Sequence, residues 1–235
     1  MGDISIIARR IEGKKRVQYG WSGNSGYYNN TGVRLLSCYD DPELVEYLFG
    51  LGQMSLIGKP KSELGGESWF YTHMLSKIPH WLGKSEREIF SKIAFVDYGY
   101  FYDLDNIWYY IIPGPFRIKI PLMYIDQHLD ENKYEFDERA RINRLVAEYI
   151  LGEYFDSDDE LQSLINSKYP NGIDKIRKAV SSSDFPCHQI WEKYRFIYKF
   201  LDDWVVVKTN DEMTTLTGFV VKRKQSENRI ETIDW

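Results

Sequence analysis

The feature that most constrains the fold is a run of aromatic and apolar residues at 94–120, AFVDYGYFYDLDNIWYYIIPGPFRIKI. Aromatic side chains favour pleated, half-buried strands, and turn-forming residues interrupt the run at 103–106 and at 113–115. Proline lacks the N–H group that a strand needs, so the second interruption must end a strand. The run therefore predicts three consecutive antiparallel strands, a meander at about 94–120.

Three tyrosines share one face of the first predicted strand. Side chains alternate across a strand, so Tyr98, Tyr100 and Tyr102 point to the same side. One interpretation is a core sheet with tyrosine hydroxyl groups at its edge, since large aromatic side chains mostly serve burial. The other is an exposed surface that recognises a partner, and on this basis the three tyrosines are candidate binding residues.

Hairpins are predicted at both ends of the chain. Segments 4–9 and 16–21 alternate like strands around a glycine-containing turn, and segments 204–209 and 214–222 form a second such pair. The stretch 20–32 is rich in glycine, serine and asparagine and predicts a loop.

Helices are indicated by start signals and by apolar residues at helical spacing. Asp41 followed by Pro42 is an N-cap with proline in the first turn, and Ser85 with Glu88 forms a capping box. Segment 33–39 fits either a strand or a helix, because its length and periodicity do not decide. Further helices are predicted at 121–129, 137–155, 158–168, 173–180 and 187–201.

Together these elements predict an α+β fold with a mainly antiparallel sheet and a helical segment at about 122–201. We expect a single domain, 1–235, with a helical insert at 126–201. The alternative is two domains, 1–120 and 121–235.

Composition excludes several classes of function. The net charge is −5, so no overall basic field favours nucleic acid. No run approaches the roughly 20 apolar residues of a membrane span, and the N-terminal apolar run is too short for a signal peptide. Cys38 and Cys187 fit no paired metal-ligand spacing, so thiols in a reducing cytoplasm are the expectation, with no metal and no cofactor.

One cluster has the composition of an active site. It comprises Ser62, Glu63, Glu67, Ser68 and His73 around two glycines. Glu67 could orient His73, which would act as a general base on a water or on the hydroxyl group of Ser62. The cluster predicts a hydrolase or transferase, although it matches no motif of known mechanism. A polar loop that caps the next segment explains the same residues.

Acidic residues are concentrated in one part of the chain. Segment 126–160 holds twelve acidic and four basic residues, a local net charge of −8, which leaves +3 for the remainder. Its densest run contains Asp156, Asp158, Asp159 and Glu160, without the spacing of a calcium loop. A solvated helix face explains this run; so does a surface that steers a basic protein into contact. With the abundant aromatic residues, it favours a non-catalytic, cytoplasmic protein-binding module that sequesters its partner, as antitoxins and immunity proteins do.

Overall fold

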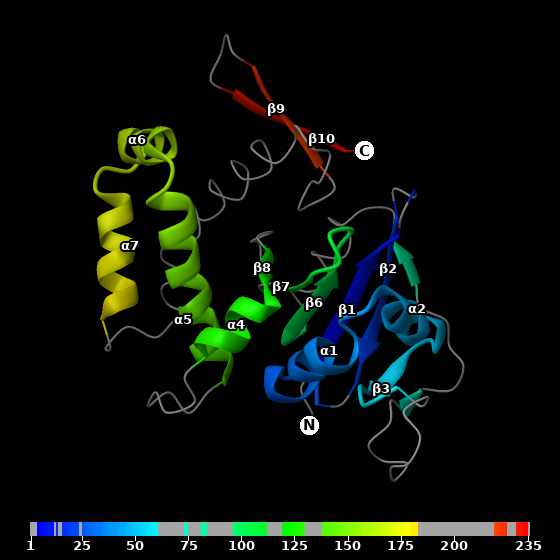
Figure 1. The fold of residues 1–235 in the computed structure, drawn as a ribbon. Helices are drawn as coiled ribbons and strands as arrows, with labels where there is room; N and C mark the ends of the chain where they lie inside the picture. The colour runs from blue at the N-terminus through cyan, green and yellow to red at the C-terminus, as the bar shows by residue number, and fades with distance from the viewer. Residues whose placement is uncertain are drawn as a thin grey trace.

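A mixed β-sheet with helices packed on one face forms the centre of the computed structural model (Figure 1). The structure describes residues 4–11, 13, 16–23, 25–60, 73–74, 81–83, 96–111, 119–129, 138–182, 219–224 and 229–234. Eight strands of these ranges join in one sheet, in the order β4-β3-β2-β1-β6-β7-β8, with β5 also paired to β2. The strands are β1 (Ser5–Arg10), β2 (Val17–Ser22), β3 (Met54–Leu56), β4 (His73–Met74), β5 (Trp81–Gly83), β6 (Tyr98–Tyr102), β7 (Trp108–Ile111) and β8 (Lys119–Pro121).

The predicted meander is confirmed. Strands β6, β7 and β8 are antiparallel neighbours, with Tyr100 opposite Tyr110 and Tyr110 opposite Ile120. The turn between β6 and β7 includes Asn106 at φ 61°, a left-handed conformation that asparagine tolerates better than most residues. The N-terminal hairpin is also confirmed, since β1 and β2 pair antiparallel and Gly13 adopts φ 68° in their turn.

The described sheet is mixed: most of its strand pairs are antiparallel, as predicted, but two pairs at its centre are parallel. Strand β1 lies between β2 and β6 and runs parallel to β6, with Ile7 opposite Tyr100. Strand β3 is also parallel to β2, at the pair Ser22 and Met54. Adjacent strands in sequence form hairpins from local turn signals, whereas these parallel pairs join distant segments for which no local signal exists.

The C-terminal hairpin lies further along the chain than predicted. Strands β9 (Phe219–Lys224) and β10 (Arg229–Asp234) pair antiparallel, with Val221 opposite Thr232. The predicted strand at 214–222 overlaps β9, but its partner follows it in sequence, because the polar residues 225–228 separate two strand-like segments. Residues 204–209, the partner that we predicted, lie outside the described ranges.

The ambiguous segment near residue 33 is helical. Tyr28–Gly32 forms a π-helical turn, η1, that continues into α1 (Val33–Cys38), so the predicted loop at 20–32 is much shorter than expected. Helix α2 (Pro42–Gly50) begins as predicted, because the Asp41 side chain accepts the Glu43 N–H at 2.7 Å.

The helical segment is confirmed in the two parts that the structure describes, 122–129 and 138–182. It contains α4 (Leu122–His128), α5 (Glu138–Ile150), the π-helical turn η3 (Leu151–Phe155), α6 (Asp159–Lys168) and α7 (Gly172–Ser181). The predicted helix at 187–201 and the capping box at 85–88 lie outside the described residues.

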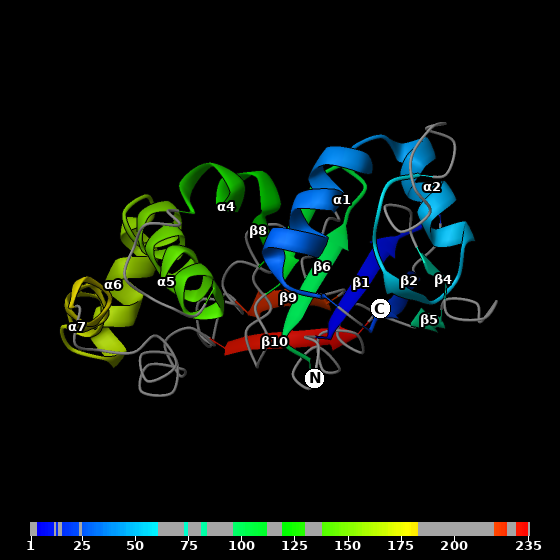
Figure 2. The same cartoon turned by 90° about the horizontal axis from the view of Figure 1, so that it is seen from below.

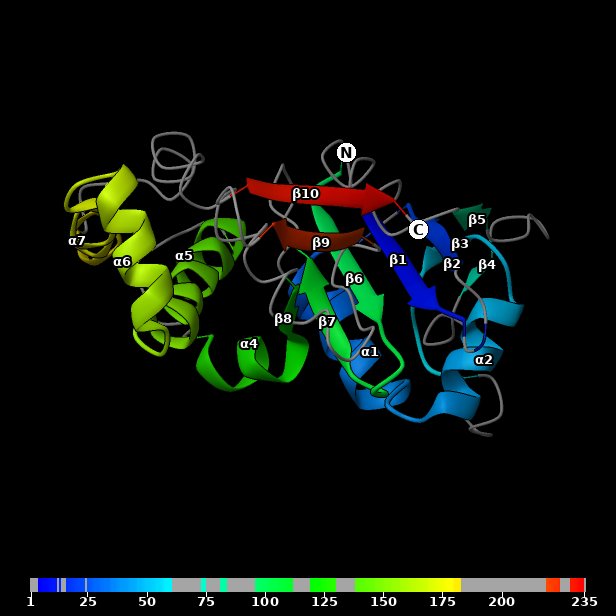
Figure 3. The same cartoon turned by 90° about the horizontal axis from the view of Figure 1, so that it is seen from above.

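The two faces of the sheet contribute to separate apolar clusters. Ile7, Tyr98 and Tyr100 point to the face that α1 and α2 cover, and this cluster continues through α4 into α5, α6 and α7. Ile6 and Phe101 point to the opposite face. Figure 2, seen from below, shows α1 and α2 on one face of the sheet, and Figure 3, seen from above, shows β6 between β1 and β7. The choice between one domain and a division near residue 121 stays a prediction.

Candidate functional site

The candidate binding tyrosines of β6 lie in the core. Tyr98, Tyr100 and Tyr102 are only 4%, 0% and 6% exposed, because helices α1 and α2 cover the face that they share. The Tyr100 hydroxyl group donates to the Gly26 carbonyl at 3.0 Å, and burial is the main cause that raises its pKa well above the usual value. The prediction that these tyrosines form an exposed recognition surface is therefore wrong. Their burial agrees with the other interpretation, a core sheet.

The acidic run at 156–160 is used in part by the fold itself. The Asp158 side chain accepts the Leu161 N–H at 3.0 Å and caps α6, while Asp156 pairs with Arg177 of α7. Asp159 and Glu160 lie exposed in the first turn of α6. Asp156 and Asp158, which we predicted as binding residues, thus have structural partners, and this narrows the surface that the run offers to another protein.

The predicted catalytic cluster cannot be assembled from the described residues. His73 belongs to the short strand β4, which pairs with β3. Ser62 and Glu67 fall in 61–72, outside the described residues, so the convergence of the cluster stays a prediction.

A surface that the sequence interpretation missed lies on α4 and the end of α5. The rings of Tyr124 and His128 stack, with centroids 4.2 Å apart and planes at 22°, and the Tyr149 ring meets Tyr124 edge-on at 4.6 Å. Two exposed carboxylates, Glu148 and Glu153, accompany these rings. We call these five residues the acidic aromatic surface.

Electrostatics link the rings and carboxylates of this surface. Burial and then the negative charges of Glu148 and Glu153 raise the pKa of Tyr124. Burial followed by Glu153 and Tyr124 raises the pKa of Tyr149. His128 Nδ1 lies 2.9 Å from the Tyr124 carbonyl oxygen, which can only accept, so this nitrogen carries a proton and donates. The surface combines the half-buried rings of Tyr124 and Tyr149 with two exposed carboxylates, a pairing suited to cationic side chains.

The π-helical turn η1 holds both helices of the surface in place. The Tyr28 hydroxyl group donates to Asp126 of α4 at 2.8 Å. The Glu138 carboxylate at the start of α5 accepts the backbone N–H groups of Tyr28 at 2.7 Å and Asn29 at 3.1 Å. Asp126 and Glu138, two members of the predicted acidic segment, therefore serve to orient α4 and α5.

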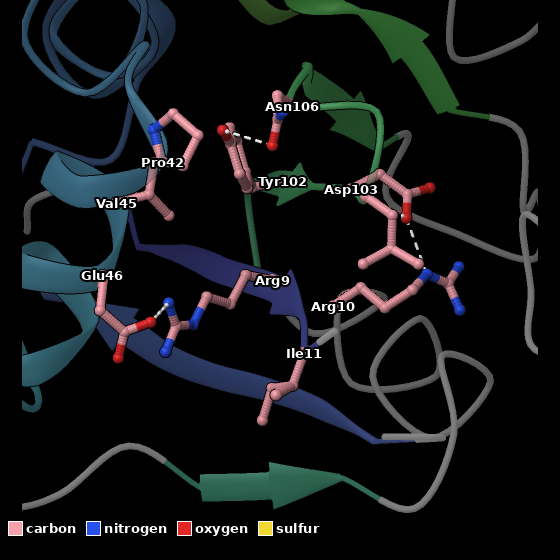
Figure 4. Close-up of a pocket in the computed structure, with 10 residues that line it drawn as sticks. Arg9, Arg10, Ile11, Pro42, Val45, Glu46, Tyr102, Asp103 and Asn106 are labelled. Atoms are coloured by element: carbon pink, nitrogen blue, oxygen red, sulfur yellow. Dashed lines mark hydrogen bonds and ion pairs between the residues drawn. The ribbon is translucent and has the colours of Figure 1, made fainter. Parts of the chain in front are cut away.

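A cavity of about 390 Å³ opens at the carboxyl ends of β1 and β6, beside α2 (Figure 4). Its described lining residues come from β1 and the residue after it, from α2, from the last residue of β6 and from the β6–β7 turn. They are Arg9, Arg10, Ile11, Pro42, Val45, Glu46, Tyr102, Asp103, Leu104 and Asn106. We call this space the Arg9 cavity.

Two arginines with different partners lie along this cavity. Arg9 donates through Nε to Gln18 at 2.8 Å, pairs with Glu46, and lies 4.9 Å from the centroid of the Phe49 ring. Arg10 pairs through Nε with the buried Asp103 at 2.7 Å. The sequence signal for this cavity was the pair of adjacent arginines at the end of a predicted strand. They lie near the turn at 103–106 only because β1 pairs in parallel with β6.

Two further tests concern bound ions and membranes. Among the residues that the structure describes, no three histidine, cysteine or acidic side chains gather in a way that could hold a metal ion. Of the helices in those same ranges, none has both the length and the apolar character to cross a bilayer.

Comparison with known proteins gives no guide to the family, since no family model, no curated protein and no solved structure matches the chain.

Proposed function

We propose that this protein is a non-catalytic binding module that captures a basic protein partner on the acidic aromatic surface. The observation that supports this most directly is the cluster of Tyr124, stacked on His128 and met edge-on by Tyr149, next to Glu148 and Glu153. Tyrosine rings bury a large area with few rotatable bonds and are enriched in protein interfaces.

The carboxylates and the rings have separate roles in the proposal. Glu148 and Glu153 attract a positively charged segment and raise the rate of encounter, with a strong dependence on salt. The ring faces of Tyr124 and Tyr149 then hold lysine or arginine side chains by cation–π contact, which slows dissociation. Asp159 and Glu160 of α6 extend the negative field without belonging to the contact itself.

A titration with a defined probe tests this proposal. The probe is an unstructured peptide rich in lysine and arginine, added to the full chain while backbone amide resonances are recorded by NMR. We expect the largest shifts in α4 and at the end of α5, and an affinity that falls as ionic strength rises. Shifts centred on another part of the chain would contradict the proposal.

Paired charge variants separate a local surface from a general effect of net charge. The double variant Glu148→Gln with Glu153→Gln should slow association at low salt by on the order of tenfold. The control, Asp40→Asn with Glu43→Gln, removes the same charge from exposed positions near the start of α2 and should change the rate far less. Equal effects of the two double variants would show that association depends on net charge and not on this surface.

An aromatic variant tests the second role. Tyr149→Ala should leave the association rate nearly unchanged and speed dissociation, because the ring contributes contact area rather than charge. The hydrolase or transferase hypothesis, with His73, Glu67 and Ser62, stays an alternative prediction that no described geometry favours.

A further inference from the structure

The Arg9 guanidinium has two partners that hold it in place and a third, the Glu46 carboxylate, that is exposed to solvent. Gln18 and the Phe49 ring fix its position, and its side chain is only 13% exposed. Its remaining partner, the Glu46 carboxylate, belongs to a side chain that is 73% exposed. Exposed ion pairs contribute little net stability, so another anion can replace Glu46 at small cost.

The other polar side chains among the described lining residues each have at least one partner within the cavity wall. Arg10 and Asp103 form an ion pair whose carboxylate also accepts the Leu104 N–H, and the Tyr102 hydroxyl group donates to Asn106. The remaining described residues of the wall are apolar, namely Ile11, Pro42, Val45 and Leu104. Within the described part of the wall, a ligand would therefore find Arg9, whose ion-pair partner Glu46 is exposed, beside the Arg10–Asp103 pair and apolar side chains (Figure 4).

We propose that the Arg9 cavity binds a small organic monocarboxylate with an apolar body, which takes the place of the Glu46 carboxylate on Arg9. This site is separate from the acidic aromatic surface and does not rest on the proposed function.

Charge and shape both favour this class of ligand. With Glu46 displaced, the charged side chains among the described lining residues, two arginines and Asp103, leave a net charge of +1, which one carboxylate neutralises and a phosphate dianion would exceed. A carboxylate also matches the planar fork of a guanidinium, while its apolar body packs against Val45 and Leu104. The cavity volume of about 390 Å³ lies in the range of small-molecule sites.

The position of the cavity agrees with this proposal. It opens where the parallel neighbours β1 and β6 end, and the chain leaves the sheet there in both cases. Ligands of sheets with parallel strands commonly bind at the carboxyl ends of those strands, since diverging loops leave room for them there.

Benzoate is the probe that tests the proposal on the full chain. We expect saturable binding with a dissociation constant on the order of 1 mM, as for a fragment of its size, and a shift of the Arg9 side-chain Nε–H resonance in NMR spectra. Benzamide, which has the same shape without the charge, should not bind. Benzamide binding as tight as benzoate binding, no saturable benzoate binding, or inorganic phosphate that binds more tightly than benzoate would each overturn the carboxylate assignment.

Two variants of α2 with the same charge change provide the decisive comparison. Glu46→Gln weakens the internal competitor and should tighten benzoate binding about two- to fivefold, the range expected from loss of an exposed ion pair. Glu43→Gln, an exposed position outside the cavity, should change affinity by less than that. Equal tightening in both variants would show that only the bulk charge matters and would overturn the proposal.

Arg9→Lys tests the fork geometry. It keeps the charge but loses the bidentate contact, and we expect benzoate affinity to fall by about tenfold or more. Thermal unfolding shows whether the variant folds, and if it does not, the comparison of Glu46→Gln with Glu43→Gln decides the matter. A folded Arg9→Lys protein that binds benzoate like the wild type would place the ligand elsewhere.

Discussion

The hydroxyl group of Tyr28 donates a 2.8 Å hydrogen bond to Asp126, 98 positions further along the chain. This bond connects η1 to α4, and the Tyr28 ring itself is buried. Tyr28→Phe removes the bond without changing the shape of the ring, and we expect the free energy of unfolding to fall by about 1–2 kcal/mol. Urea unfolding at pH 7 measures this, with Tyr47→Phe, a 37% exposed position on α2, as the control that should change little.

The same tyrosine gives the protein a characteristic response to alkaline pH. Burial, and then the hydrogen bond and negative charge of Asp126, raise the pKa of Tyr28 above its usual value of 10.0. Burial is also the first cause that raises the pKa of Tyr100 and Tyr109. In the unfolded chain these phenols release protons from about pH 10, while the folded chain retains them, so stability must fall as pH rises above 10.

Denaturation at a series of pH values from about 8 to 11, a range that includes the ordinary phenol pKa, checks whether stability falls as pH rises. Each retained proton contributes a slope of up to about 1.4 kcal/mol per pH unit, so Tyr28→Phe should make the decline shallower. Wild-type stability that stays constant or rises above pH 10 would contradict the prediction.

Gly32 has no room for a side chain. A Cβ atom at this position would lie 2.5 Å from Cδ2 of Tyr28, and the ring cannot retreat because it is buried and bonded to Asp126. We expect Gly32→Ala to destabilise the fold by about 1–3 kcal/mol. Gly50→Ala, where a Cβ atom would meet nothing within 4 Å, should be neutral or slightly stabilising, so thermal melts of the two variants should diverge.

The buried pair of Arg10 and Asp103 should be costly to break from one side. The Arg10 side chain is only 14% exposed, and Asp103→Ala deprives its guanidinium of this carboxylate. The variant also removes the acceptor of the Leu104 N–H. The expected loss is about 3–5 kcal/mol in the free energy of unfolding. In a double-mutant cycle with Arg10→Met, the second change should cost much less once Asp103 is absent; additive losses would show that the two residues act independently.

Asp158 offers a way to separate structure from charge in the acidic run. Asp158→Ala should destabilise α6 by about 1 kcal/mol, because the cap on the Leu161 N–H is lost. Asp158→Asn removes the same charge but keeps a good capping side chain, and its stability should remain close to that of the wild type. Equal losses in the two variants, measured by circular dichroism on heating, would mean that charge rather than capping matters.

Local signals in the sequence were sufficient for the elements whose partners are close in the chain. Alternation and turn residues identified the β1–β2 hairpin and the meander, and the pair Asp41 and Pro42 identified the start of α2. The short stretch that became α1 was ambiguous, because its apolar residues fit both periods and only its packing on the sheet decides.

The site depended on contacts that no local pattern contains. Tyr124 and His128 are four residues apart and could have been recognised as neighbours on a helix, but Tyr149 joins them only through the packing of α4 against α5. The charge of segment 126–160 indicated an acidic surface, yet Asp126, Glu138, Asp156 and Asp158 hold parts of the fold together. Composition reports how many carboxylates a segment has, whereas their partners depend on tertiary structure.

The parallel pairing of β1 with β6 has a consequence for the order of events during synthesis. Strand β1 can pair with β2 as soon as the hairpin leaves the ribosome, but its other edge needs Tyr98–Tyr102, which begin 93 residues after Ser5. At translation rates of about 5–20 residues per second, that edge waits for roughly 5–20 s. Throughout this interval the backbone groups of a strand that ends up at the centre of the sheet are open to pairing with other chains. The nascent chain therefore exposes an edge of β1 that β6 covers in the folded protein. A chaperone bound near this edge would protect it during that interval.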